Sequence, residues 1–162
     1  MDALAHSLEL IRAQLNAALQ AAEPRAEDWV ILANVTGQDG AAFADARDKI
    51  AMMLVTITSD ATQRASARGP DGAPPPAAHL EVLVAFLANF ESANYPKGLA
   101  AIARTIAFFQ KTQVFVAPDA GGATMQMHAA ELTLAEVSDV MRMMGVRYRP
   151  SVFYRMRGVP VD

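Results

Sequence analysis

Arginine residues gather near the end of the chain, where their spacing suits specific binding. Arg147 and Arg149 alternate in one short segment, as do Arg155 and Arg157 in the next. Alternation along an extended backbone puts both members of a pair on one side. A guanidinium group binds a carboxylate through two parallel hydrogen bonds, so the pattern favours recognition of acidic side chains on a partner. The alternative is a solvated face.

Tyrosines interleave with these arginines, and protein interfaces are enriched in both residue types. The residues that we predict to form an interface with another subunit or a partner protein are Tyr148, Arg149, Tyr154, Arg155 and Arg157. We expect them on or beside a final strand with a partly exposed edge. Nucleic acid fits less well, because the chain has 14 basic and 17 acidic residues and a net charge of −3.

Residues that support catalysis or metal binding form no recognisable motif. The histidines, His6, His79 and His128, are far apart and have no second ligand at metal-binding spacing. Cysteine is absent, which excludes disulfides, thiolate zinc sites and cysteine nucleophiles. The common phosphate-binding, dinucleotide-binding and nucleophile-elbow motifs are also absent. We therefore expect no enzyme, no cofactor and no metal. The competing hypothesis is a small enzyme or ligand-binding domain whose site is built from scattered acids, arginines and tyrosines.

Composition indicates one domain over residues 1–162. Hydrophobic residues make up 52% of the chain and charged residues 19%, a balance that can fill a substantial core. No window approaches the ~20 apolar residues of a membrane helix. The chain begins Met-Asp without a basic leader, so we expect a soluble protein of the cytoplasm.

One helix is well marked near the end of the chain. Thr133 and Glu136 have the spacing of a capping box. The apolar residues that follow at helical period are Leu134, Val137, Val140, Met141 and Met144. Gly145 is suited to end the helix, and Pro150 forces an extended backbone before it. Residues 151–161 are rich in β-branched and aromatic side chains and predict a strand.

This end of the chain resembles a known family. Residues 146–157, VRYRPSVFYRMR, follow a helix that ends in Met-Gly. They are similar to the C-terminal signature of the tail terminator, or cap, proteins of phage-tail-like contractile injection systems. The likeness extends to Pro96-Lys97-Gly98-Leu99 and Phe108-Phe109-Gln110, which resemble the family's central helix and its end. The resemblance covers most of the chain.

The resemblance implies a structural function. A ring, expected to be hexameric, would sit on the distal end of the tube and sheath of an injection particle or phage-like tail. It would stop polymerisation and stabilise the extended sheath. The implied partners are other copies of the chain and the tube and sheath proteins. The implied location is a phage-tail-like particle or virion tail assembled in the cytoplasm.

Hydrophobic periodicity predicts the elements of the first half. Asp2 can cap a helix with a single apolar stripe that reaches Ala22. Residues 29–35 and 50–58 are apolar runs that predict strands. Between them we expect a loop with one helical turn. Residues 64–78 combine prolines, glycines and alanines and predict a mobile loop.

The second half completes the predicted fold. Strict alternation from His79 predicts a strand that pairs antiparallel with residues 50–58. A helix then begins at Tyr95-Pro96. Its expected buried stripe is Leu99, Ile102, Ala103, Ile106 and Phe109. Short strands follow before the last helix. Together these elements predict an α+β fold: a mixed or mostly antiparallel sheet of about four to six strands, with three helices packed mainly on one face.

Overall fold

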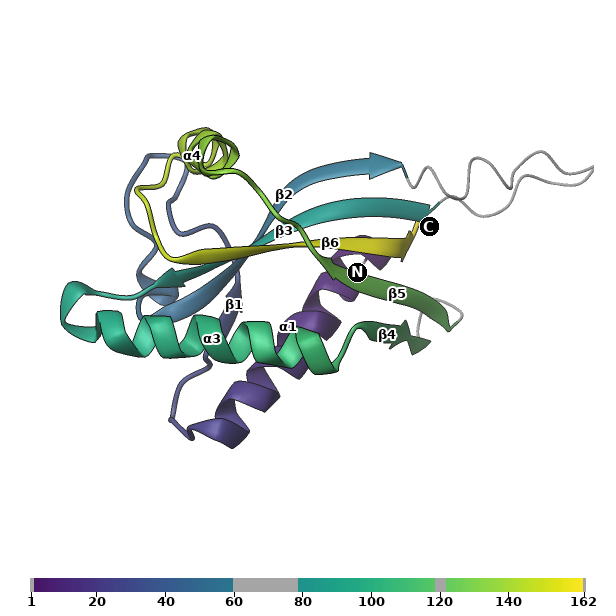
Figure 1. Cartoon of the computed structure of the whole chain (residues 1–162), viewed down its shortest axis with the longest axis horizontal. Coiled ribbons are helices and arrows are strands. Elements are labelled where there is room, and N and C mark those ends of the chain that lie inside the picture. Colours follow the sequence, from purple (N-terminus) through teal and green to yellow (C-terminus); the bar gives the residue numbers. More distant parts are fainter. Residues whose placement is uncertain (1, 60–78, 119–121, 162) are drawn as a thin grey trace, which may run out of the picture.

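The computed structural model describes residues 2–59, 79–118 and 122–161, and Figure 1 shows how their elements are arranged. The helices are α1 (Ala3–Ala22), α3 (Tyr95–Lys111) and α4 (Leu134–Met143), with 3-10 turns η1 (Ala44–Ala46) and η2 (Ser92–Asn94). The strands are β1 (Val30–Leu32), β2 (Lys49–Ser59), β3 (His79–Asn89), β4 (Val114–Ala117), β5 (Ala123–Ala129) and β6 (Ser151–Pro160). The predicted α+β fold is confirmed. The loop predicted at residues 64–78 lies outside the described residues.

The described strands form one mixed sheet in the order β1-β2-β3-β6-β5-β4. β1 pairs with β2 in parallel, and the other neighbours are antiparallel. The predicted pairing of β2 with β3 is confirmed, with Met52 opposite Phe86 and Leu54 opposite Val84. The predicted exposed edge of the final strand is wrong. β6 lies between β3 and β5, so both of its backbone edges are hydrogen-bonded.

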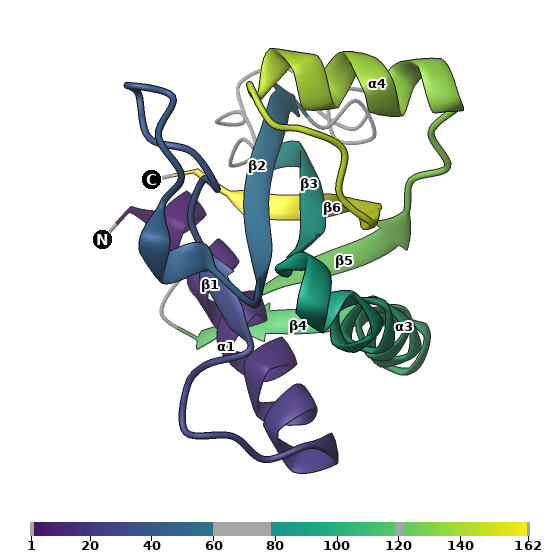
Figure 2. The ribbon, with the colours of Figure 1, turned by 90° about the vertical axis from the view of Figure 1, so that its left-hand side faces the viewer.

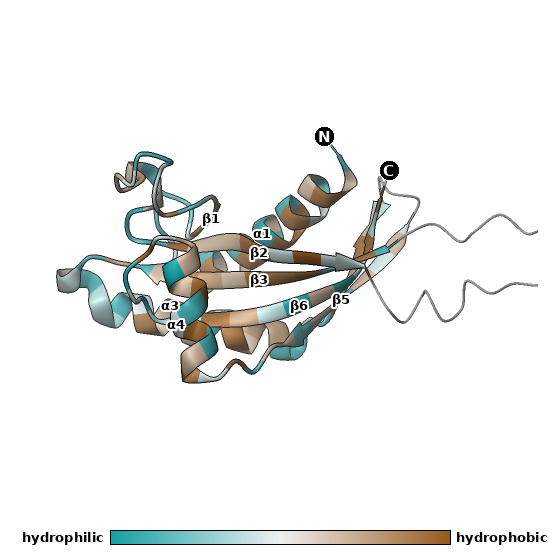
Figure 3. Cartoon of the chain, turned by 90° about the horizontal axis from the view of Figure 1, so that it is seen from above, coloured by the Kyte–Doolittle hydropathy of each residue, from teal (hydrophilic) through white to brown (hydrophobic). Residues whose placement is uncertain are grey.

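Two helices cover one face of the sheet, and the third covers the other face (Figure 2). α1 and α3 share a core with Phe86 and Tyr154 of the sheet. α4 packs over Ala85 and Phe153 on the opposite face. The expectation that the helices lie mainly on one face therefore holds for α1 and α3 only. The reason is that β2 and β3 are hydrophobic on both faces along much of their length (Figure 3), so a second covering layer is needed.

The sheet curls around α1. β1 and β4 belong to opposite edges of the sheet, yet both contact this helix. On the concave side, the rings of Phe86, Phe109 and Tyr154 form an aromatic cluster with centroid separations of 4.5, 5.1 and 5.9 Å. These spacings are within the range of favourable aromatic pairs. The concave core therefore fixes the inner surface of β6.

The predicted buried stripe of α3 is partly wrong. Leu99 is 45% exposed, and the fully buried positions are Gly98, Ala101, Thr105 and Phe109. Small residues line this side because α3 approaches the core closely. A Cβ atom on Gly98 would lie only 3.0 Å from Cγ of the Phe90 ring. The helix therefore turns its small residues inward and one of its leucines outward.

The predicted start of α4 is confirmed. The Thr133 hydroxyl accepts a hydrogen bond from the Glu136 amide at 3.2 Å, and the Glu136 carboxylate accepts one from the Thr133 amide at 2.7 Å. The apolar stripe is less complete than predicted. Met141 is buried, whereas Leu134 is 83% exposed. α4 therefore covers only part of the convex face, and its first turn leaves Leu134 exposed.

Candidate assembly surface

Tyr154 is a core residue of the chain. Its side chain points to the concave face, where only 4% of the residue is exposed and its ring lies 4.5 Å from the Phe109 ring centroid. Burial raises the pKa of the phenol above its ordinary value. The prediction that Tyr154 lies at a surface with the arginines is therefore wrong for the single chain. The next residue of β6 points to the other face because side chains alternate along a strand.

Arg155 and Arg157 share that convex face, where both contact Glu81. The Arg157 Nε donates to the Glu81 carboxylate at 2.5 Å, and the Arg155 Nη1 donates to its second oxygen at 3.3 Å. The Glu81 side chain is only 16% exposed, whereas both arginine side chains are nearly half exposed. These two guanidinium groups are thus already paired with an acid of the same chain. Their capacity for a second carboxylate is reduced accordingly.

Tyr148 and Arg149 lie before β6, in the segment that connects it to α4. Tyr148 is 67% exposed. The Arg149 Nε donates to the Asn89 side-chain oxygen at 3.4 Å, and its Nη1 donates to the Tyr148 carbonyl at 3.2 Å. Neither Arg149 nor Arg147 pairs with a carboxylate in the described part of the chain. The connecting segment therefore carries two guanidinium groups that no carboxylate of the described residues neutralises.

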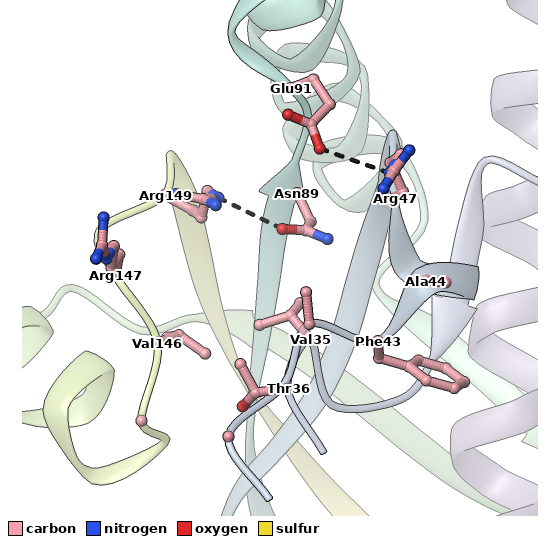
Figure 4. Close-up of a pocket in the computed structure, with 13 residues that line it drawn as sticks. Val35, Thr36, Phe43, Ala44, Arg47, Asn89, Glu91, Val146, Arg147 and Arg149 are labelled. Carbon is pink, nitrogen blue, oxygen red and sulfur yellow. Dashed lines mark hydrogen bonds and ion pairs between the residues drawn. The ribbon is translucent and has the colours of Figure 1, made fainter.

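This segment forms one wall of a pocket of about 300 Å³, which Figure 4 shows from close up. The opposite wall comes from the connection between β1 and β2, and the end of β3 lies between the walls. Arg149 and Arg47 lie on either side of Asn89, with Glu91 above it (Figure 4). Arg47 and Glu91 form an ion pair of 3.5 Å. The pocket is lined by Val35, Thr36, Gly40, Ala42, Phe43, Ala44, Arg47, Asn89, Glu91, Gly145, Val146, Arg147 and Arg149.

An exposed apolar surface adjoins Tyr148 on the other side of the connecting segment. Leu134 and Met143 of α4 are largely exposed, and a shallow hollow runs from Leu134 along Val137 and Met141 to Tyr148. Large exposed apolar side chains that occur together are typical of contact surfaces. Tyr148 therefore stands between an apolar hollow and a basic pocket.

Comparison with known families shows the family to which the chain belongs. The family described as the Pvc16 N-terminal domain matches residues 8–162. The chain belongs to this family. The Pvc16 N-terminal domain thus accounts for nearly the whole chain, and the resemblance to terminator proteins is confirmed. A comparison with curated proteins gives no match.

Solved structures share the fold of this Pvc16 N-terminal domain. One is a PVC sheath/tube terminator of an extracellular contractile injection system in the extended state, with 15% identity, a TM-score of 0.60 and coverage of 98% of this chain and 56% of the other. Another is the tube-terminating cap of the anti-feeding prophage, with 13% identity, a TM-score of 0.52 and coverage of 93% and 53%. The present chain spans slightly more than half the length of these proteins.

The Pvc16 N-terminal domain brings together residues that the sequence does not mark as partners. Arg47, Asn89 and Glu91 line the basic pocket with Arg149, although they come from distant segments. From the sequence, only the arginine-rich segment could be predicted as part of a site. The contacts between the loops depend on the topology of the sheet. No group of three or more histidine, aspartate or glutamate side chains among residues 2–59, 79–118 and 122–161 could hold a metal ion. Within the same ranges, none of the helices has the length and hydropathy to cross a membrane.

Proposed function

We propose that this Pvc16 N-terminal domain is a structural part of a cap at the distal end of the tube and sheath of a contractile injection system or phage-like tail. The observation that carries the proposal is the fold shared with a sheath/tube terminator over 98% of the chain. The similarity to the tube-terminating cap of the anti-feeding prophage supports it. The competing hypothesis of an enzyme or ligand-binding domain has no comparable support.

The physical requirements of a cap agree with the structure. A cap needs one surface complementary to the last layer of a polymer and another that cannot template a further layer. The surface around Tyr148 offers exposed apolar area and two guanidinium groups that have no carboxylate partner among the described residues, a combination enriched at protein interfaces. We propose that Tyr148, Arg149, Arg155 and Arg157 contact a neighbouring subunit or a tube or sheath protein. Tyr154 would support them from the core.

The cap would be a closed ring of identical subunits, with six as the expected number. Rings arise when a head-to-tail contact between subunits closes after a fixed number of rotations. The ring would be non-enzymatic and would act on the particle as it assembles in the cytoplasm. Each subunit would contribute through contact area and charge, since catalysis is not needed to stop a polymer.

Particle length tests this proposal. Particles would be assembled in cells that lack the chain and in cells that produce it, and their lengths measured by negative-stain electron microscopy. We expect a narrow length distribution with the chain and a broad one, or few intact particles, without it. Native mass spectrometry of the cap fraction should give six copies per ring. A narrow distribution in cells without the chain would refute the proposal.

A further inference from the structure

The pocket between the two connecting segments concentrates positive charge. Arg47, Arg147 and Arg149 line it, and Glu91 is the only acidic residue among the lining side chains. The pocket thus has an excess of two positive charges, whereas the whole chain has a net charge of −3. The Glu91 carboxylate pairs with Arg47 at 3.5 Å, and both side chains are more than half exposed, so this internal pair is weak.

Asn89, at the end of β3, orients the Arg149 side chain for binding a ligand. The Asn89 amide nitrogen donates to the Ala46 carbonyl at 2.8 Å, which orients the amide oxygen toward the Arg149 Nε. Nε and Nη1 of Arg149 therefore have acceptors within the subunit, whereas Nη2 has none among the described residues. A positioned guanidinium loses less side-chain entropy when it binds an anion.

Glu91 is positioned by its backbone. The Asp48 carboxylate accepts hydrogen bonds from the Glu91 amide at 3.0 Å and from the Asn94 side chain at 3.2 Å. Asp48 itself has a positive φ of 54°, and its amide donates to the Asn89 carbonyl at 2.8 Å. The rim of the pocket is therefore built from a defined set of hydrogen bonds. The carboxylate of Glu91 remains within reach of Arg47 as an internal competitor.

The size and floor of the pocket limit the kind of ligand. Its volume of about 300 Å³ lies at the lower end of the range for ligand sites, which is too small for a large cofactor. Val35, Phe43 and Val146 supply apolar area beside the guanidinium groups. An acidic side chain with an apolar neighbour satisfies both features, because carboxylates pair with guanidinium forks and the neighbour covers the apolar floor.

We infer that this pocket binds the carboxylate of an acidic side chain on a partner protein. The identity of this partner, a protein of the assembling particle, rests on the proposed function. The binding step itself is a property of the isolated chain. An incoming carboxylate would pair with Arg149 and Arg147 and would compete with Glu91 for Arg47.

NMR titration of the isolated chain with N-acetyl-L-aspartic acid methylamide tests the binding step. This probe carries one side-chain carboxylate, and sodium chloride would keep the ionic strength constant. We expect saturable shifts of the side-chain Nε–H signals of Arg47, Arg147 and Arg149. The double variant R147Q/R149Q should weaken binding about tenfold or more, because it removes charge-assisted hydrogen bonds. The double variant K97Q/K111Q also removes two positive charges, but from exposed positions outside the pocket, and should leave the affinity unchanged.

Removal of the Glu91 carboxylate, which competes with the ligand for Arg47, should change the affinity in the opposite direction. Glu91→Gln should increase the affinity for the probe several-fold. Glu131→Gln makes the same charge change outside the pocket and should not. Absence of saturable shifts, or equal affinity in R147Q/R149Q, would overturn the inference. Inorganic phosphate binding more than ten times as tightly as the probe would also overturn it, since the pocket would then select another class of anion.

Particle assembly separates this inference from the proposed function. R147Q/R149Q particles that keep a normal length, although the isolated variant has lost the probe, would overturn the assembly role of the pocket. The proposed function would survive that result, because it is tested by deletion of the whole chain. Broad particle lengths for R147Q/R149Q and normal lengths for K97Q/K111Q are the expected result.

Discussion

Gly158 of β6 lies close to the backbone of β5. Its φ is 76°, and a Cβ atom at this position would lie 2.5 Å from the carbonyl oxygen of Thr124. Thr124 lies on β5, which is paired on both sides, so its backbone cannot move away. The pairing of β3 with β6 also shifts register at this end. Glycine is therefore required here for both its conformation and its lack of a side chain.

Gly158→Ala should destabilise the subunit by more than about 3 kcal/mol, since left-handed strain and a backbone clash add. Gly145→Ala is a matched control. Gly145 also has a positive φ, but nothing lies within 4 Å of its added Cβ, so only the strain of roughly 1–2 kcal/mol applies. Urea unfolding followed by circular dichroism measures both. Equal losses would show that the close approach to Thr124 is unimportant.

Tyr154 predicts a dependence of stability on alkaline pH. Burial raises the pKa of its phenol, so the unfolded chain releases the proton first as the pH rises. The associated stability is fully present below the ordinary tyrosine pKa of about 10 and is lost as the pH rises from there through the raised value. Tyr154→Phe keeps the ring and removes the titration.

Urea unfolding of the wild type and of Tyr154→Phe from about pH 8 to about pH 11 tests this prediction. Other groups titrate in the same range, but their contributions cancel in the difference between the two proteins. The wild type should lose stability relative to the variant above about pH 10. A difference that stays constant with pH would mean that the phenol is not perturbed.

The arginine pair on β6 has a carboxylate partner, whereas the pair in the segment before β6 has none among the described residues. Arg155 and Arg157 of β6 flank Glu81 of β3 at 3.3 and 2.5 Å, whereas Arg147 and Arg149 precede the strand and have no carboxylate partner among the described residues. Glutamates at both β6 positions would bring three carboxylates together on neighbouring strands. That change would test the stability of the sheet as well as contact with a partner.

R155E/R157E should lower the free energy of unfolding by about 1–3 kcal/mol, because like charges on adjacent strands repel. R147E/R149E makes the same change in total charge and should stay within about 0.5 kcal/mol of the wild type. Thermal unfolding at low and high salt measures both, and added salt should reduce the loss in the first variant. Equal stabilities would mean that Glu81 does not hold β3 and β6 together.

Elements with local signals could be predicted from the sequence. The capping box at Thr133 and Glu136 needs only four consecutive residues, and it is present as predicted. The alternation after His79 likewise locates β3. The buried side of α3 could not be predicted in the same way. Gly98 and Ala101 face the core because the helix lies close to Phe90, and hydropathy alone assigns that place to Leu99.

At the scale of the whole molecule, the basic pocket depends on topology. The sequence indicates the importance of the segment with Arg147 and Arg149. It gives no sign that Arg47 and Glu91 will meet them at the end of β3, since more than forty residues separate each contributing segment from the next. The edge position predicted for β6 is wrong for a related reason. A last strand is easily placed at an edge, whereas here antiparallel partners on both sides enclose it.

Because β6 joins the two parts of the sheet, its removal should abolish folding. Among the described strands, β4 and β5 are connected to β1, β2 and β3 only through β6. A chain that ends at residue 150 should show no cooperative unfolding transition in circular dichroism, whereas one that ends at residue 160 should unfold cooperatively. A cooperative transition in the shorter chain would show that either part of the sheet is stable without its central strand.

The central place of β6 also sets the timing of folding during synthesis. Residues 90–150 separate β3 from β6, and at ~5–20 residues per second the ribosome needs about 3–12 s to make them. Throughout that interval the edge of β3 that pairs with β6 has no partner strand. Such surfaces attract other nascent chains. Each newly made subunit therefore passes through a period of several seconds in which protection by a chaperone is most needed.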